Sequence, residues 1–174
     1  MTKLRTANLL GALAGAVVER LEARLKSHPN QTGSAAAALN LIALYEGCSN
    51  VALSQALRLS HPATVRLVDK LEATGLVENR QGNDRRAVAL YLMPAGRERM
   101  RAVLEERCLT LDAIIDVLSP DQRQQLDGIA ETLLRVFAAT PLESVHICRL
   151  CDESRCPADL CPVHQQALSL LAKG

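Results

Sequence analysis

The chain has 174 residues, enough for one domain, or for one domain with a small appendage, at roughly 100–200 residues per domain. Hydrophobic residues make up 48% and charged residues 22%, which argues against a disordered chain. The net charge of +1 argues against a uniformly basic nucleic-acid coat but permits a local basic patch. With one Phe, two Tyr and no Trp, the chain lacks the aromatic platforms that bind single-stranded nucleic acid by stacking.

The N-terminal segment admits two readings. Lys3 and Arg5 precede an apolar run over residues 7–18, the outline of a secretory signal. However, leucines and alanines recur at three- and four-residue steps as far as Leu25. This helical periodicity continues unbroken past Ala12-Leu13-Ala14, the segment that resembles a signal-peptide cleavage site. We therefore expect an amphipathic helix that ends near Pro29. No apolar run reaches the ~18 residues of a membrane span, and we expect a soluble, cytoplasmic protein.

Three short helices are predicted next, each with a capping signal. Ser60 precedes the third of them, and Pro62 lies in its first turn, where a missing N–H is tolerated. Gly75 follows that helix and supplies its stop. The second and third helices, separated by residues 58–60, form a helix-turn-helix pattern. The expected helix ranges are 35–45, 51–57 and 61–74.

The period then changes to that of strands. Residues 76–80 and 88–92 read as two strands around a turn cluster at 81–84, which makes a β-hairpin. Two longer helices follow, beginning at Pro94 and at Pro120. The predicted fold is mainly α with a small β-hairpin wing: a winged helix-turn-helix with a helical dimerisation domain. The domain ranges are 33–94 for the winged helix, 1–30 with 95–140 for dimerisation, and 144–174 for a cysteine-rich tail.

A winged helix places its second helix in the major groove of DNA and its hairpin against the minor groove or backbone. Arg66 has the fork that pairs two guanine acceptors, and Val65 can touch a thymine methyl. Arg58 and Lys70 suit phosphates, and the wing arginines suit a narrow minor groove. The residues expected to contact DNA are Arg58, Ser60, His61, Pro62, Val65, Arg66, Lys70, Arg80, Arg85 and Arg86.

Residues 49–96 resemble the winged helix of the MarR family of bacterial transcription regulators. The resemblance is carried by residues 53–60, by residues 66–77, and most specifically by 84–96, where Asp-x-Arg is followed by a strand and a Gly. It implies a homodimer that binds a pseudo-palindromic double-stranded operator, usually as a repressor released by a small-molecule effector or by oxidation. It also implies that Asp84 and Arg86 pair to hold the wing.

The sequence departs from the family pattern at three places. Arg58 stands where the family often has Gly at the turn between the two helices. Residues 61–63 are His, Pro and Ala, where members commonly carry Ser and Thr, so the operator of another member does not transfer to this chain. Met93 stands where Thr usually caps the following helix.

The tail carries Cys148, Cys151, Cys156 and Cys161 in the spacing Cys-x2-Cys-x4-Cys-x4-Cys. Four thiolates complete a tetrahedron around a metal ion, and a cytosolic location disfavours stable disulfides. Zinc is the expected cofactor, an iron–sulfur cluster is the alternative, and a redox or disulfide role stays open. We expect the flanking His146 and His164 not to be ligands.

The leading functional hypothesis is a sequence-specific, DNA-binding transcription regulator that responds to a ligand, a metal or a redox signal. The alternative is a winged-helix protein–protein assembly module with a structural metal site. An enzyme is not expected, because no nucleophile–base pair or phosphate loop is visible and a four-Cys site leaves no open coordination position.

Overall fold

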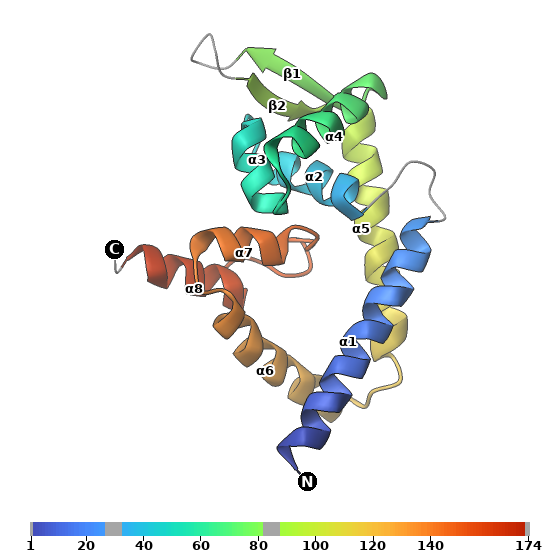
Figure 1. Cartoon of the computed structure of the whole chain (residues 1–174). Coiled ribbons are helices and arrows are strands. Elements are labelled where there is room, and N and C mark those ends of the chain that lie inside the picture. Colours follow the sequence, from blue (N-terminus) through green and yellow to red (C-terminus); the bar gives the residue numbers. More distant parts are fainter. Residues whose placement is uncertain (1, 27–32, 82–87, 173–174) are drawn as a thin grey trace.

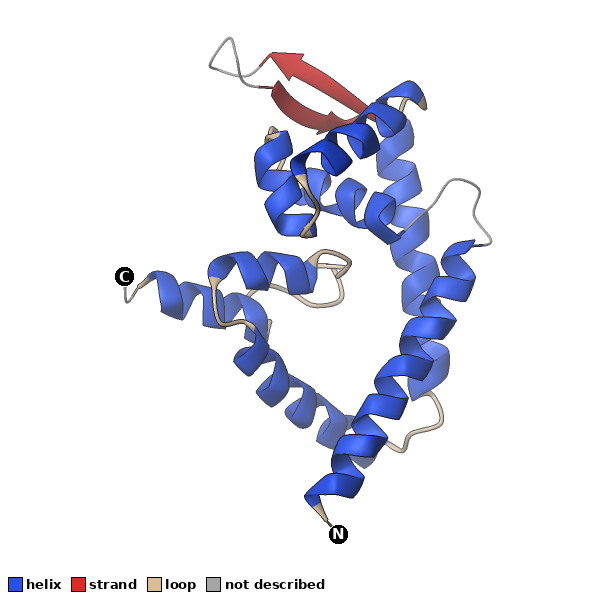
Figure 2. Cartoon of the chain, viewed as in Figure 1, coloured by secondary structure: helices blue, strands red, loops and turns tan. Residues whose placement is uncertain are grey.

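The computed structural model describes residues 2–26, 33–81 and 88–172 (Figure 1). These residues are mostly helical, and their sheet consists of two strands that form a hairpin (Figure 2). In chain order the elements are α1 (Lys3–Lys26), α2 (Gly33–Leu44), α3 (Asn50–Leu57), α4 (His61–Ala73), β1 (Val77–Gln81), β2 (Val88–Leu92), α5 (Pro94–Ile115), α6 (Pro120–Phe137), α7 (Pro141–Cys148) and α8 (Pro162–Leu171). No described helix is both long and apolar enough to cross a membrane.

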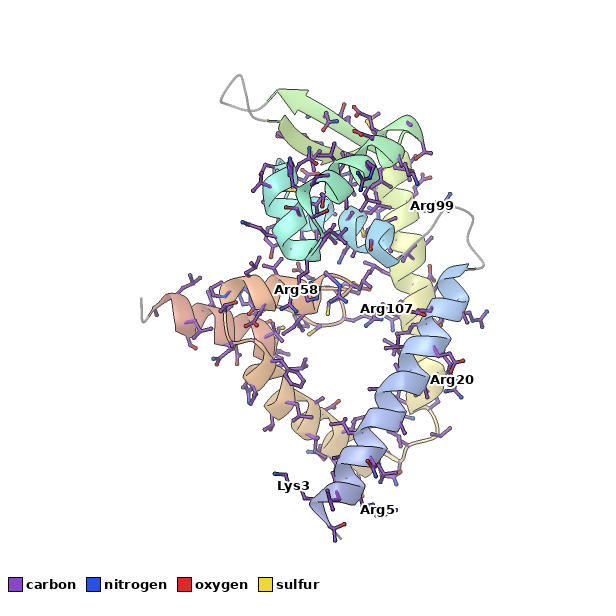
Figure 3. The ribbon with its side chains drawn as sticks, in the orientation of Figure 1. Lys3, Arg5, Arg20, Arg58, Arg99 and Arg107 are labelled. Atoms are coloured by element: carbon purple, nitrogen blue, oxygen red, sulfur yellow. The ribbon has the colours of Figure 1, made fainter. Side chains whose placement is uncertain are left out.

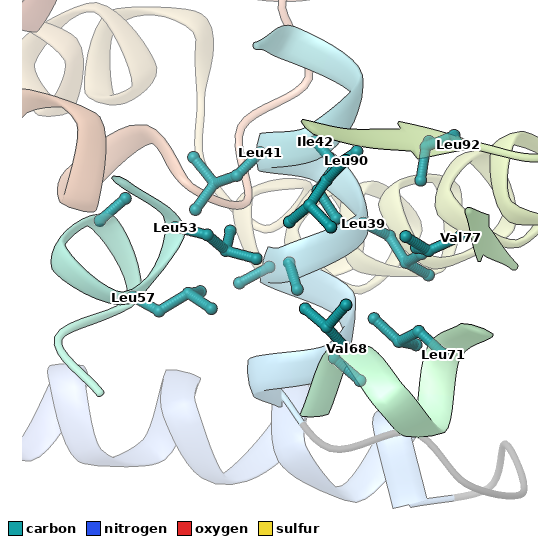
Figure 4. Close-up of a cluster of buried hydrophobic side chains, with 14 residues drawn as sticks. Leu39, Leu41, Ile42, Leu53, Leu57, Val68, Leu71, Val77, Leu90 and Leu92 are labelled. Atoms are coloured by element: carbon teal, nitrogen blue, oxygen red, sulfur yellow. The ribbon is translucent and has the colours of Figure 1, made fainter. Parts of the chain in front are cut away.

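The core of the winged helix is built around α2. Its alanines at 35–38 are all buried, and such small side chains let the neighbouring helices approach closely. Leu39 and Ile42 of the same helix are fully buried and meet Val68 of α4 and Leu90 of β2 (Figure 4). This cluster fixes α3, α4 and the hairpin relative to one another, which sets the orientation of any DNA-reading face.

The caps predicted at Ser49, Ser60 and Ser119 are present, whereas Ser34, the predicted cap of α2, lies inside that helix because it begins at Gly33. The Ser49 side chain accepts a hydrogen bond from the Ala52 N–H at 3.2 Å, and Ser60 accepts one from Ala63 at 3.4 Å. Ser119 and Gln122 form the reciprocal capping box at the start of α6. Met93 precedes α5 without any side-chain cap, and Pro94 occupies the first turn, where no N–H is needed.

The wing is an antiparallel pair of strands in which Val77 faces Leu92 and Gln81 faces Val88. Cys48 forms an isolated bridge to Leu90, through backbone hydrogen bonds that include Leu90 N–H to Cys48 carbonyl at 3.0 Å. This bridge adds a further backbone segment at the base of the wing, which sequence patterning did not predict. The hairpin is thereby anchored to the helical core at the middle of β2.

Two long helices lead away from the winged helix. α1 packs along α5, and Arg24 of α1 lies 3.5 Å from Glu106 of α5 (Figure 1). α6 diverges from that pair, has no buried residue along its length and packs on α8. α7 then returns to lie beside α3, so the chain end meets the winged helix again (Figure 1).

The cysteine-rich tail contains two helices. α7 begins at Pro141 and α8 begins at Pro162. The Thr140 side chain caps α7 by accepting from the Glu143 N–H at 3.1 Å. Ala138, Cys161 and Val163 are buried together, and this small cluster joins the two helices.

Candidate nucleic-acid interface and cysteine cluster

Helix α4 presents two different faces. The spacing predicts an inward stripe of Thr64, Leu67, Val68 and Leu71: Leu67 is half-buried against the core and the other three are buried. The Thr64 hydroxyl donates to the Ser60 carbonyl at 3.3 Å. The opposite face is solvent-accessible and combines apolar, acidic and basic side chains. The exposed residues of this face are His61, Pro62, Arg66, Asp69 and Lys70, with Val65 half-buried beside them. This helix can therefore offer side chains to a groove without disturbing the core.

Arg58 ends α3 and opens the turn to α4. Its backbone is left-handed, with φ 55° and ψ 39°, the conformation for which the family often uses Gly. The departure in sequence therefore leaves the turn geometry intact, at a cost of about 1 kcal/mol in backbone strain. The Arg58 side chain is exposed and lies 3.8 Å from Glu143 of α7, facing the tail (Figure 3). Ser60 is exposed two residues later.

The described part of the wing has one basic side chain in a defined position. Arg80 of β1 pairs with Glu78, and its guanidinium lies over the Tyr91 ring at 4.4 Å from the centroid. Arg85 and Arg86, predicted to contact DNA, lie outside the described residues. The expected pair of Asp84 with Arg86 lies outside them as well.

The four tail thiols interact with one another. They lie close enough to shift one another's pKa: Cys148 interacts with Cys151 and Cys161, and Cys156 interacts with Cys161. Cys161 is buried at the start of α8, and its Sγ accepts from the His164 N–H at 3.5 Å. Within the described ranges, no three His, Cys, Asp or Glu side chains already have the arrangement of ligands around one ion.

The thiols differ in acidity because their surroundings differ. The hydrogen bond from Cys148, together with nearby Arg107 and Arg149, lowers the pKa of Cys151 to about 7, against the effect of burial. The same hydrogen bond, followed by burial, raises the pKa of Cys148. Burial, followed by Cys161, raises the pKa of Cys156 to about 11. The pKa of Cys151 is thus lower than those of Cys148 and Cys156.

Backbone and side-chain contacts join the cysteine segment to the winged helix. The Asn40 amide of α2, 2% exposed, donates to the carbonyls of Arg149 at 3.2 Å and Cys151 at 3.1 Å. His146 Nδ1 lies 2.8 Å from the Ala56 carbonyl of α3. Sequence reasoning missed Asn40, although an amide within the apolar run of 35–45 was the available signal.

A cavity of about 450 Å³ lies between α1, α2, α5 and α7. Its apolar wall includes Leu21, Leu57 and Val103. Arg107, Arg149 and His146 supply basic groups, while Glu22 and Glu106 add carboxylates. An apolar wall with a few convergent polar groups is the usual make-up of a small-molecule site.

Residues 32–87 match the sequence profile of the MarR family. This segment, which holds α2, α3, α4 and β1, is similar to that family over about a third of the chain. The transcriptional repressor MprA of Escherichia coli K12 is 37% identical over 83 residues, which are 47% of this chain and 47% of that protein. The chain therefore matches about half the length of this curated relative.

Solved structures agree on the MarR-family fold. The DNA complex of Streptococcus pneumoniae FabT has a TM-score of 0.67 at 19% identity and covers 78% of this chain and 96% of that one. Apo MarR of Escherichia coli has a TM-score of 0.62 at 20% identity, covering 74% and 96%. A MarR-family protein of Bacillus stearothermophilus gives 0.67 at 23%, covering 76% and 95%. The first of the three was solved in complex with DNA.

The MarR-family match accounts for α2 to α4 and β1, and the cysteine cluster lies outside it. The predicted DNA-contacting residues 58–80 all fall within the matched segment. The similarity to the family therefore includes the exposed face of α4 and does not extend to the cysteine-rich tail.

Proposed function

We propose that the chain is a cytoplasmic, sequence-specific DNA-binding repressor that acts as a homodimer on a pseudo-palindromic operator. One observation carries the proposal: the MarR-family winged helix leaves the outer face of α4 exposed, with Arg66 and Lys70 on it. A helix held by its inner face and exposed on its outer face is what major-groove docking requires. The named repressor MprA and the DNA-bound FabT support the same reading.

The homodimer rests on apolar surface that one protomer leaves uncovered. The exposed large apolar residues of α1 and α6 are Leu4, Leu9, Leu10, Leu13, Val18, Leu126, Ile129, Val136 and Phe137. Contiguous apolar surface of this kind marks protein interfaces, and α6 buries none of its residues within the protomer. A second copy would cover both helices, and two-fold symmetry would pair two reading heads with two half-sites. Light scattering at micromolar concentration tests this, and a monomer mass would contradict it.

Arg66→Ala tests the reading face. The variant should lose about 1–3 kcal/mol of specific binding, with discrimination lost mainly at one base pair. Fluorescence anisotropy on the chain's own promoter region, and on variants of that duplex, measures both quantities. Arg20→Ala removes the same charge from α1 and is the matched control, expected to leave binding unchanged.

The outcome also separates the two functional hypotheses. A uniform loss across all sequences would make Arg66 a phosphate contact. A wild-type protein without any specific duplex binding would favour the protein–protein assembly module.

Control by a small effector is the finer part of the proposal. The cavity between α1, α2, α5 and α7 lies where the winged helix meets the long helices, so an occupant can bias their relative position. Arg107 and Arg149 favour an apolar acid. With benzoate as the probe, we expect weaker DNA binding, and Arg107→Ala should reduce that response. Unchanged DNA binding at saturating benzoate would remove this class of effector.

A further inference from the structure

We propose that Cys148, Cys151, Cys156 and Cys161 bind one zinc ion per chain and that this centre holds α7 on the helix-turn-helix. The zinc site is inferred from the tail residues alone, independently of the proposed function. Its effect on operator binding rests on the proposed function.

The thiols already form one connected group. Cys148 ends α7, and the Cys151 N–H donates to the Cys148 carbonyl at 2.8 Å, so the Cys-x-x-Cys segment is folded into a tight turn. Cys161 begins α8, and Cys148 packs against the small buried cluster that contains Cys161. Two helix ends thus supply two of the four sulfurs, and the turn that follows α7 supplies a third. Small rearrangements of side chains would bring these sulfurs to the tetrahedral spacing that zinc requires.

The segment between the helices is where the metal is needed. Residues 153–160 are all exposed, and backbone turns such as Cys156 N–H to the Asp152 carbonyl at 3.1 Å hold their shape. The buried cluster beside them consists of Ala138, Cys161 and Val163. So small a core stabilises little, and a metal that cross-links Cys156 to the helix ends would supply the missing free energy.

The charges around the cluster fit a zinc tetrathiolate. Four thiols would release four protons to solvent on binding Zn²⁺, which leaves a centre with a net charge of −2. Arg107 of α5 and Arg149 both lie close enough to act on the Cys151 sulfur. Arg149 also lies near Arg58, so three cationic groups gather on this side of the cluster. A dianionic centre would offset their mutual repulsion.

The centre is joined to the reading head by its own backbone. The Cys151 carbonyl accepts from the buried Asn40 amide of α2, and His146 contacts the Ala56 carbonyl of α3. Ala56 lies two residues before Arg58, which opens the turn to α4. Loading the metal fixes the turn at Cys151, and α7 is thereby fixed against the helix that precedes the recognition helix.

The metal assignment is tested first, on the full-length protein purified without chelators. Elemental analysis should find one zinc per chain, and the doubly substituted C151S/C156S should contain none. Cys108→Ser removes a thiol of α5 that is not one of the four proposed ligands, and this variant should retain one zinc per chain. Iron with a visible absorption band would overturn the zinc assignment, and an absence of stoichiometric metal in the wild type would overturn the site.

The coupling is tested without DNA. Zinc removal should speed tryptic cleavage after Arg155 by about tenfold or more, and should speed amide exchange over residues 56–60 by a similar factor. Faster cleavage with unchanged amide exchange at residues 56–60 would mean that zinc stabilises the tail alone. That result would overturn the proposal that zinc holds α7 on the helix-turn-helix. Operator affinity is measured last: a wild type with zinc but no operator binding would refute the repressor and leave the metal site standing.

Discussion

Gly96 gives the sharpest test of how the wing is attached. Gly96 lies in the first turn of α5, and a Cβ added there would be 2.0 Å from the Leu76 backbone carbonyl. That carbonyl already accepts a hydrogen bond from the Met93 N–H at 3.0 Å, so it cannot move without loosening the junction of α4, the wing and α5. A backbone atom at this distance, unlike the end of a flexible side chain, has no cheap way to yield.

Two opposing effects decide the outcome for Gly96→Ala. Alanine favours a helix over glycine by about 1 kcal/mol, whereas overpacking of this severity costs about 3 kcal/mol or more. The variant should therefore lose about 2 kcal/mol, which for a chain of this size lowers Tm by roughly 4–8 °C. Urea unfolding and thermal melts measure the loss. Both use equal protein concentrations, because dimerisation makes stability concentration-dependent.

The matched control is Gly128→Ala in α6, where an added Cβ meets nothing within 4 Å of the protomer. That variant should be stabilised by about 0.5–1 kcal/mol, since only helix propensity changes. If Gly96→Ala instead melts at or above the wild-type temperature, the close approach of α5 to Leu76 is wrong.

Three further outcomes are expected. Arg58→Gly should raise stability by up to about 1 kcal/mol in urea titrations, because the left-handed conformation suits Gly, while weakening DNA binding if the side chain contacts phosphate. Ser119→Ala should cost about 1 kcal/mol through loss of the capping box, and a circular-dichroism melt with no change would show that α6 does not depend on its cap. Leu13→Glu should convert the dimer to monomer in light scattering, and a persistent dimer would exclude α1 from the interface.

The winged helix was predictable because its signals are local. Ser60 with Pro62 identifies the start of α4 within a single turn, and strict alternation over 88–92 identifies β2. The inner face of α4 followed from spacing alone: Thr64, Val68 and Leu71 are buried as predicted. Arg58 shows the limit of local signals. An Arg at this turn indicates a cost in backbone strain, but its residue type does not predict the left-handed backbone that it adopts.

The tail was harder because its structure depends on distant partners. α7 is short, and its position depends on Asn40 and Ala56, each about 90–110 residues away in the chain. Such contacts leave no periodic trace in the sequence. Proline disfavours the interior of a helix, but Pro141 and Pro162 lie in the first turns of α7 and α8, where a missing N–H is tolerated. The cysteine spacing predicted a grouping of thiols, and the structure packs Cys148 against the buried cluster of Cys161. The metal stays a prediction.

The return of α7 to α3 adds a second kind of attachment between the reading head and the rest of the protomer. Besides the continuous run from β2 into α5, the head is held to the tail by the hydrogen bonds of Asn40, by the contact of His146 with Ala56 and by the pair of Arg58 with Glu143. A domain on a single connection can pivot, whereas a second attachment removes most of that rotational freedom. In a dimer, two heads restrained in this way would accept a narrow range of half-site separations. Inserting one base pair at the operator centre should therefore penalise this chain more than a variant in which Asn40 no longer holds the tail.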